Sequence, residues 1–221
     1  MFKDILNIWK EEEFLKKVVG DFENMLKEAQ DIFDKATSVF WKKIPSQEVH
    51  ALIYSKDRKI NEEEQKIRRR LIEHLAINPR KDFTACLVFM SIVKDAERIG
   101  DYCKNIFELS YILKSSPQDN LTSSFQDLET QIRENLKEIP SAFISADNEK
   151  AVTLMQRHGK ISSQCESMIR SMIDQNFSAD KTVAYTLLLR YYKRISAHIA
   201  NIASAIINPI EKIDYVAEGL L

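Results

Sequence analysis

Apolar residues recur every three or four positions along most of this chain, the spacing that places them on one face of an α-helix. The stretch from residue 15 to residue 40 is typical, with Leu15, Phe22, Ala29, Ala36 and Phe40 among its apolar positions. Only four glycines and five prolines occur in 221 residues, so few turns are available, and the β-branched residues do not alternate as they do in strands. The sequence therefore predicts an all-α protein.

Breaks in this spacing divide the chain into six predicted helices. Pro45 ends the first helix, and Pro79 lies in the first turn of the third, where proline is favourable. The segment Ser115–Asn120 is the clearest break, and a three-helix plan repeats after it with a period of roughly one hundred residues. The helices are expected at about 12–40, 48–77, 79–114, 121–144, 148–175 and 179–207.

These boundaries predict two tandem three-helix repeats, residues 1–115 and residues 121–221. Ahead of the first long helix, apolar residues recur at helical spacing at Phe2, Ile5 and Trp9. This opening suits a short amphipathic segment that docks on the bundle or on a partner.

Composition and charge exclude several classes of protein. Lysine and arginine total 32 against 33 aspartates and glutamates, a net charge of −1, which argues against binding nucleic acid by bulk charge. The three cysteines, Cys86, Cys103 and Cys165, share no metal-ligand spacing and suit free thiols in a reducing cytosol. The longest apolar run, residues 84–93, is far shorter than the ~20 residues of a membrane helix, and no signal peptide opens the chain. We expect a cytoplasmic protein, at most peripheral to a membrane.

Acidic side chains line one side of the third predicted helix. Helical geometry places Glu97, Asp101 and Asn105 one turn apart on the same side. Two acids four residues apart destabilise an isolated helix by roughly 0.2–0.5 kcal/mol, so a nearby positive charge must offset them. Salt bridges from Lys94, Arg98 and Lys104 are one candidate source of that charge, and a metal ion held by oxygen ligands from adjacent helices is the other. A second acid-and-amide ladder, Asp57, Asn61 and Glu64, lies on the preceding helix.

The run from Glu97 to Asp101, followed by Asn105 and Ile106, resembles the acidic E(D)xxxD signature of the PhoU family with its trailing Asn-Ile. The step from Asp57 to Asn61 resembles the family's Asp-x-x-x-Asn step on the preceding helix, and the tandem layout covers nearly the whole chain. PhoU proteins are bacterial and archaeal cytosolic regulators of phosphate uptake and phosphate-starvation signalling. The resemblance implies two three-helix bundles packed side by side, each able to hold a multinuclear metal cluster.

Carried over by position, the resemblance implies a metal site, iron or zinc, with ligands Glu97, Asp101, Asp57 and Asn61, and with Glu64 as a weaker candidate. It also implies a regulator without catalytic residues. Such a protein acts by contact with the cytoplasmic components of a phosphate transporter or with a sensor kinase, as a homodimer.

The second repeat departs from the family pattern. Lys193 and Ala197 stand where the first repeat has Glu97 and Asp101, and His158 and Ser162 replace Asp57 and Asn61. A lysine in place of a carboxylate removes a ligand and repels a cation, so we expect one metal site in the chain. One side of the last helix is basic and carries Arg190, Arg194 and His198. Two interpretations of this side stay open: an anion-binding stripe or an ordinary solvated face.

Two other functional classes fit the same residues. One is a carboxylate-bridged metalloenzyme in a helical bundle, although the chain lacks the Glu-x-x-His pairs of ferritin-like di-iron sites and its four histidines are scattered. The other is a metal-free structural helical dimer. Bound metal in the purified protein distinguishes the dimer from the regulator, and oxidase turnover distinguishes the enzyme.

Overall fold

A computed structural model describes residues 13–77, 82–114 and 117–214. Within these ranges the chain forms six long α-helices and no strand, which confirms the all-α prediction. The helices are α2 (Glu13–Phe40), α3 (Ser46–Ile77), α4 (Phe83–Ile112), α5 (Thr122–Ser145), α6 (Asn148–Ser171) and α7 (Ala179–Ile207). In the described part of the chain, no helix is both long and apolar enough to cross a lipid bilayer.

The helix boundaries differ from the predicted ones mainly at two places. α4 begins at Phe83 instead of residue 79, because Asp82 before it has a left-handed backbone conformation, with a φ of 58°. α6 ends at Ser171 instead of residue 175, because its last turn tightens into a 3-10 segment, Met172–Asp174. At its other end the Asp147 carboxylate caps α6 by accepting a hydrogen bond from the Lys150 amide at 3.0 Å. Pro79 and the amphipathic opening at residues 2–9 lie outside the described residues.

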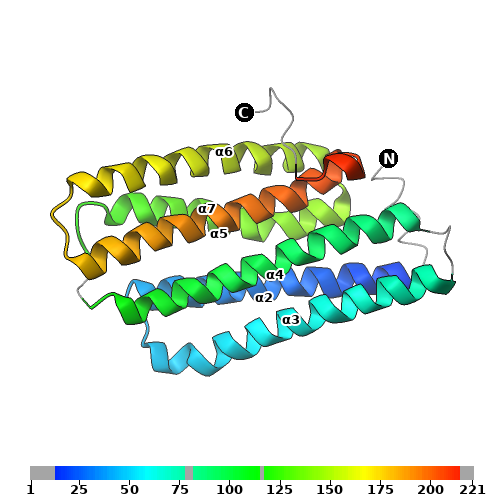
Figure 1. Cartoon of the computed structure of the whole chain (residues 1–221), viewed down its shortest axis with the longest axis horizontal. Coiled ribbons are helices and arrows are strands. Elements are labelled where there is room, and N and C mark those ends of the chain that lie inside the picture. The colour runs from blue at the N-terminus through cyan, green and yellow to red at the C-terminus, as the bar shows by residue number, and fades with distance from the viewer. Residues whose placement is uncertain (1–12, 78–81, 115–116, 215–221) are drawn as a thin grey trace.

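The two groups of three helices pack side by side, as the resemblance implied. Figure 1 shows α2, α3 and α4 in the lower half of the molecule and α5, α6 and α7 in the upper half. α4 packs against α2 and α3 within its own group and against α7 in the other, and α2 also contacts α5. At this junction Phe22, Phe89 and Phe143, from α2, α4 and α5, lie with ring centroids 5.2–5.8 Å apart. The core is therefore shared, and the division into domains at residues 115–121 stays a prediction.

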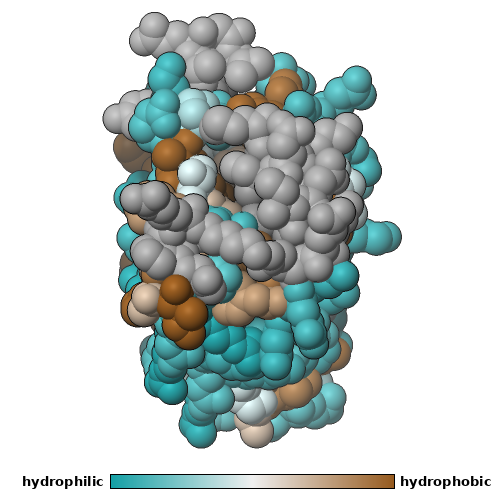
Figure 2. All heavy atoms as spheres, turned by 90° about the vertical axis from the view of Figure 1, so that its right-hand side faces the viewer, coloured by the Kyte–Doolittle hydropathy of each residue, from teal (hydrophilic) through white to brown (hydrophobic). Residues whose placement is uncertain are grey.

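The end of the molecule where α2 begins and α3 ends is shown in Figure 2. Most of the coloured surface there is hydrophilic, and its apolar areas are separate from one another. Exposed apolar side chains in this part of the chain include Ile77, the last residue of α3, and Phe83, the first of α4. Scattered apolar residues of this kind are normal on protein surfaces and do not indicate a binding site.

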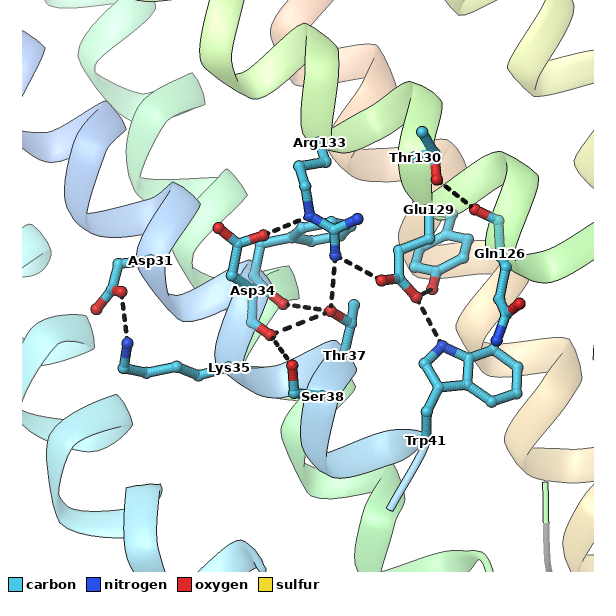
Figure 3. Close-up of polar contacts among 12 residues, drawn as sticks. Asp31, Asp34, Lys35, Thr37, Ser38, Trp41, Gln126, Glu129, Thr130 and Arg133 are labelled. Atoms are coloured by element: carbon cyan, nitrogen blue, oxygen red, sulfur yellow. Dashed lines mark hydrogen bonds and ion pairs between the residues drawn. The ribbon is translucent and has the colours of Figure 1, made fainter. Parts of the chain in front are cut away.

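A buried carboxylate joins the two halves of the molecule. Glu129 of α5 is 4% exposed and accepts hydrogen bonds from the Trp41 indole Nε1 at 2.6 Å and from Arg133 Nη2 at 2.5 Å. The guanidinium of Arg133 reaches on to α2, where its Nε donates to Asp34 Oδ1 at 2.7 Å. Figure 3 shows Arg133 between Asp34 and Glu129, with Trp41 on the far side of Glu129. A buried charge with these partners ties α2 to α5.

The Glu129 contacts predict a measurable cost when the charge is removed. Glu129→Gln keeps the shape of the side chain but leaves Arg133 and Trp41 with a weaker acceptor, so we expect urea denaturation to show a loss of about 1–3 kcal/mol in the free energy of unfolding. Glu134→Gln, at an exposed position of the same helix, is the matched control and should stay within about 0.5 kcal/mol of the unmodified protein. Equal effects of the two substitutions would contradict the role given to Glu129.

Candidate functional site: an acidic cluster between α3 and α4

A glycine in the acidic motif allows α3 and α4 to approach closely. A Cβ atom built on Gly100 would lie 2.9 Å from Cδ1 of Ile60 and 3.5 Å from its Cγ2. Ile60 is itself buried, at 1% exposure, so the side chain has little room to yield. The glycine between Glu97 and Asp101 therefore brings the polar side of α4 against α3.

Four carboxylates gather along this helix contact, and we call Asp57, Glu64, Glu97 and Asp101 the acidic cluster. Asp57 and Glu64 come from α3, and Glu97 and Asp101 come from α4. Their side chains are 11%, 15%, 14% and 26% exposed, in that order. The two ladders come together at Asp57 and Asp101, which share a partner.

That shared partner is the ammonium group of Lys104. Its Nζ lies 2.8 Å from Asp57 Oδ2 on α3 and 3.5 Å from Asp101 Oδ1 on its own helix. Arg98 lies on the other side of Asp101, with Nη1 3.1 Å from Asp101 Oδ2 and Nε 3.5 Å from Glu97 Oε2. Glu64 pairs with Arg68 one turn further along α3, at 2.9 Å. Each carboxylate of the acidic cluster therefore has a cationic side chain beside it.

The negative charge of Glu97 remains unfavourable despite these pairs. Burial, followed by the negative charge of Asp101, raises the pKa of Glu97 to about 7. Glu64 adds to this rise in pKa, and Arg98 opposes it. The pKa of Glu97 thus lies close to neutral pH, where small changes in nearby charge change its protonation.

The arrangement does not fit a metal ion as it stands. Among the described residues, no group of three or more His, Cys, Asp or Glu side chains is close enough together to hold one. The ammonium of Lys104 takes the contacts with Asp57 and Asp101 that a bridging cation would make. Asn61, the fourth predicted ligand, is half-buried on α3 one turn after Asp57. Metal binding at Glu97, Asp101, Asp57 and Asn61 stays a prediction, and the salt bridges from Arg98 and Lys104 are present.

In the second repeat the corresponding positions carry a different chemistry. Lys193 of α7 pairs with Glu166 of α6, and His158 Nδ1 lies 3.1 Å from Ser196 Oγ. Burial, with a contribution from Lys193, lowers the pKa of His158, so the imidazole favours its neutral form. These contacts contain no pair of carboxylates facing each other.

The predicted basic stripe on α7 is not a single surface. Arg190 and Arg194 are exposed, but His198 lies against α4, where its Nδ1 is 2.7 Å from Asp95 Oδ1. Asp95 is 6% exposed and also accepts a hydrogen bond from Asn201 Nδ2 at 2.9 Å. Sequence reasoning missed this contact between the repeats, because its residues are 103 and 106 positions apart and follow no local pattern.

The close approach at Gly100 can be tested by adding bulk. Gly100→Val places three carbon atoms against Ile60, so we expect a loss of about 1–3 kcal/mol in the free energy of unfolding, measured by urea denaturation. The control is Gly20→Ala in α2, where nothing lies within 4 Å of the added Cβ and the gain in helix propensity should stabilise the protein by about 0.5–1 kcal/mol. A stabilised Gly100→Val protein would show that the helices do not meet there.

The raised pKa of Glu97 predicts how stability changes with pH. Between about pH 4.5 and pH 7 the folded protein holds a proton on Glu97 that the unfolded chain has released, so this group stabilises the fold at low pH and its contribution falls as pH rises. Denaturation between pH 5 and pH 8 in buffer with a chelator should show that Glu97→Gln removes part of this dependence. An unchanged pH profile in Glu97→Gln would contradict the raised pKa.

Comparison with known proteins places this fold and these motifs in a family. The PhoU domain model matches residues 22–110 and again residues 125–206. A phosphate-specific transport system accessory protein PhoU homolog from Caulobacter vibrioides, present in two strains, is 27% identical over 141 residues. That alignment covers 62% of this chain and 60% of the relative, so the chain spans less than two thirds of the length of the relatives it matches.

Two solved structures have the same fold. The phosphate transport system regulatory protein PhoU from Streptococcus pneumoniae superposes with a TM-score of 0.73 at 20% identity, covering 88% of this chain and 95% of that one. PhoU from Pseudomonas aeruginosa gives a TM-score of 0.70 at 20% identity, covering 96% and 99% of the two chains. Since the family model matches both halves of the sequence and most of its length, this chain belongs to the PhoU family.

Proposed function

We propose that this protein regulates a phosphate transport system and acts by contact with other proteins. The observation that carries the proposal is the match of the PhoU domain to both halves of the chain, at residues 22–110 and 125–206. The Caulobacter relatives, which are named as accessory proteins of a phosphate-specific transport system, support the same pathway. The proposed partners are the cytoplasmic components of a phosphate transporter or a sensor kinase, which would place the protein in the cytoplasm.

The chemistry of the acidic cluster supports a contact role over a catalytic one. Its carboxylates are paired with Lys104, Arg98 and Arg68, and the pair between Lys104 and Asp57 joins α4 to α3. The three thiols are buried, and burial raises the pKa of Cys86 to about 11 and that of Cys165 to about 12, which keeps both in the unreactive protonated form. We therefore propose a non-enzymatic regulator.

The resemblance to the family also implies a metal site and a homodimer, and each has its own direct measurement. Metal analysis of the purified protein, with Asp101→Ala as the comparison, tests iron or zinc at Glu97, Asp101, Asp57 and Asn61. Size-exclusion chromatography with light scattering tests the dimer. These two measurements are independent of the pathway in which the protein acts.

Deleting the gene tests the proposed function. We expect the deletion to alter phosphate uptake or a phosphate-starvation reporter in cells grown with ample phosphate, and the unmodified gene to restore it. Cross-linking and affinity purification of the restored protein should recover a transporter component or a sensor kinase, which distinguishes the two proposed partners. Uptake and reporter activity that are the same with and without the gene would contradict the function.

A further inference from the structure

The ammonium group of Lys104 lies between carboxylates from two helices. Lys104 follows Asp101 by three residues on α4, and its side chain crosses to α3 to reach Asp57. One positive charge is thereby shared between carboxylates from two helices. A metal cation makes contacts of the same kind in a site built from oxygen ligands on adjacent helices.

Both side chains of the contact between Lys104 and Asp57 are largely shielded from solvent. The Lys104 side chain is 20% exposed and that of Asp57 is 11% exposed, so water weakens their attraction less than it would at the surface. Burial by itself would lower the pKa of Lys104, but the hydrogen bond and charge of Asp57, with the charge of Asp101, outweigh burial and raise that pKa above its ordinary value. Lys104 is therefore charged throughout the physiological range.

Neighbouring contacts hold Lys104 in this place. One turn beyond it on α4, Glu108 accepts a hydrogen bond from the Tyr54 hydroxyl of α3 at 2.9 Å. On its other side, Arg98 occupies the second oxygen of Asp101. Glu108 is thus engaged with Tyr54, while Asp57 and Asp101 lie beside the ammonium group.

We propose that Lys104 is a tethered cation that takes the place of a metal ion between α3 and α4, so that this chain holds its acidic cluster together without metal. A divalent ion that used Asp57 and Asp101 would have to displace the ammonium and leave it without these partners. The second repeat follows the same principle, because Lys193 of α7 stands at the position of Glu97 and pairs with Glu166 of α6. Lys104 thereby lowers the affinity of the first repeat for metal ions.

The test is a metal titration of Lys104 variants in the full chain. Lys104→Gln removes the charge but keeps a side chain that can donate a hydrogen bond to Asp57, and Lys104→Met removes both. With Mn²⁺ and Zn²⁺ as probes in isothermal titration calorimetry, we expect each variant to bind at least about tenfold more tightly than the unmodified protein, a change equal to 1.4 kcal/mol. Lys94→Met, the same substitution at an exposed position of α4, should leave binding unchanged.

Adding Asp57→Asn to Lys104→Gln should abolish the gained binding, because Asp57 supplies the α3 side of the contact. The proposal is overturned if the unmodified protein binds either metal as tightly as the Lys104 variants, or if neither variant gains affinity. If Lys104→Met unfolds, Lys104→Gln alone decides the question. If both unfold, displacement of Lys104 is measured in the unmodified protein: stoichiometric metal binding that leaves the Lys104 ammonium NMR signal unperturbed overturns the proposal.

Discussion

The packing of α4 against three other helices is the constraint on which the rest of this structure depends. α4 contacts α2 and α3 in the first repeat and α7 in the second, so one helix takes part in both halves of the core. It can do so because its apolar residues cover more than one face: Val88 and Ile106 lie on one face and Phe89 and Val93 lie roughly 100° or more around the helix, all of them at most 3% exposed. Some of its polar side chains then lie in the interfaces, where a buried polar group needs a partner.

The polar side chains at these interfaces meet that requirement in different ways. Towards α3, Asp101 is neutralised by Lys104 and Arg98, and Gly100 permits the helices to come close enough for Lys104 to reach Asp57. Towards α7, Asp95 is satisfied by His198 and Asn201. Paired buried charges of this kind specify which helices meet more than they add net stability. Glu129 and Arg133 of α5 are paired in the same way, and Arg133 fixes the position of α5 against α2 by its contact with Asp34 (Figure 3).

The local pattern of apolar residues predicted much of the fold of this molecule. The recurrence of apolar residues identified all six helices and the break near residue 117, because helix periodicity is a property of neighbouring residues. The spacing of Glu97 and Asp101 placed them on one side of α4, where Asp101 shares Lys104 with Asp57 of α3. What could not be predicted is the reach of Lys104 to Asp57, 47 positions away, or the choice between a salt bridge and a metal, because both depend on how two helices are set against each other. The contacts of Glu129 with Trp41 and of Asp95 with His198 escaped prediction for the same reason.

The central claim is that an ammonium group fills the cation position between Asp57 and Asp101 in the folded protein. The most direct measurement is a nitrogen-detected NMR spectrum of the lysine side chains near neutral pH. A sheltered, ion-paired ammonium exchanges its protons slowly with water, so the account predicts that the Lys104 signal persists and that Asp57→Asn broadens or removes it. A Lys104 signal that exchanges as fast as that of exposed Lys94, with no response to Asp57→Asn, would contradict the claim.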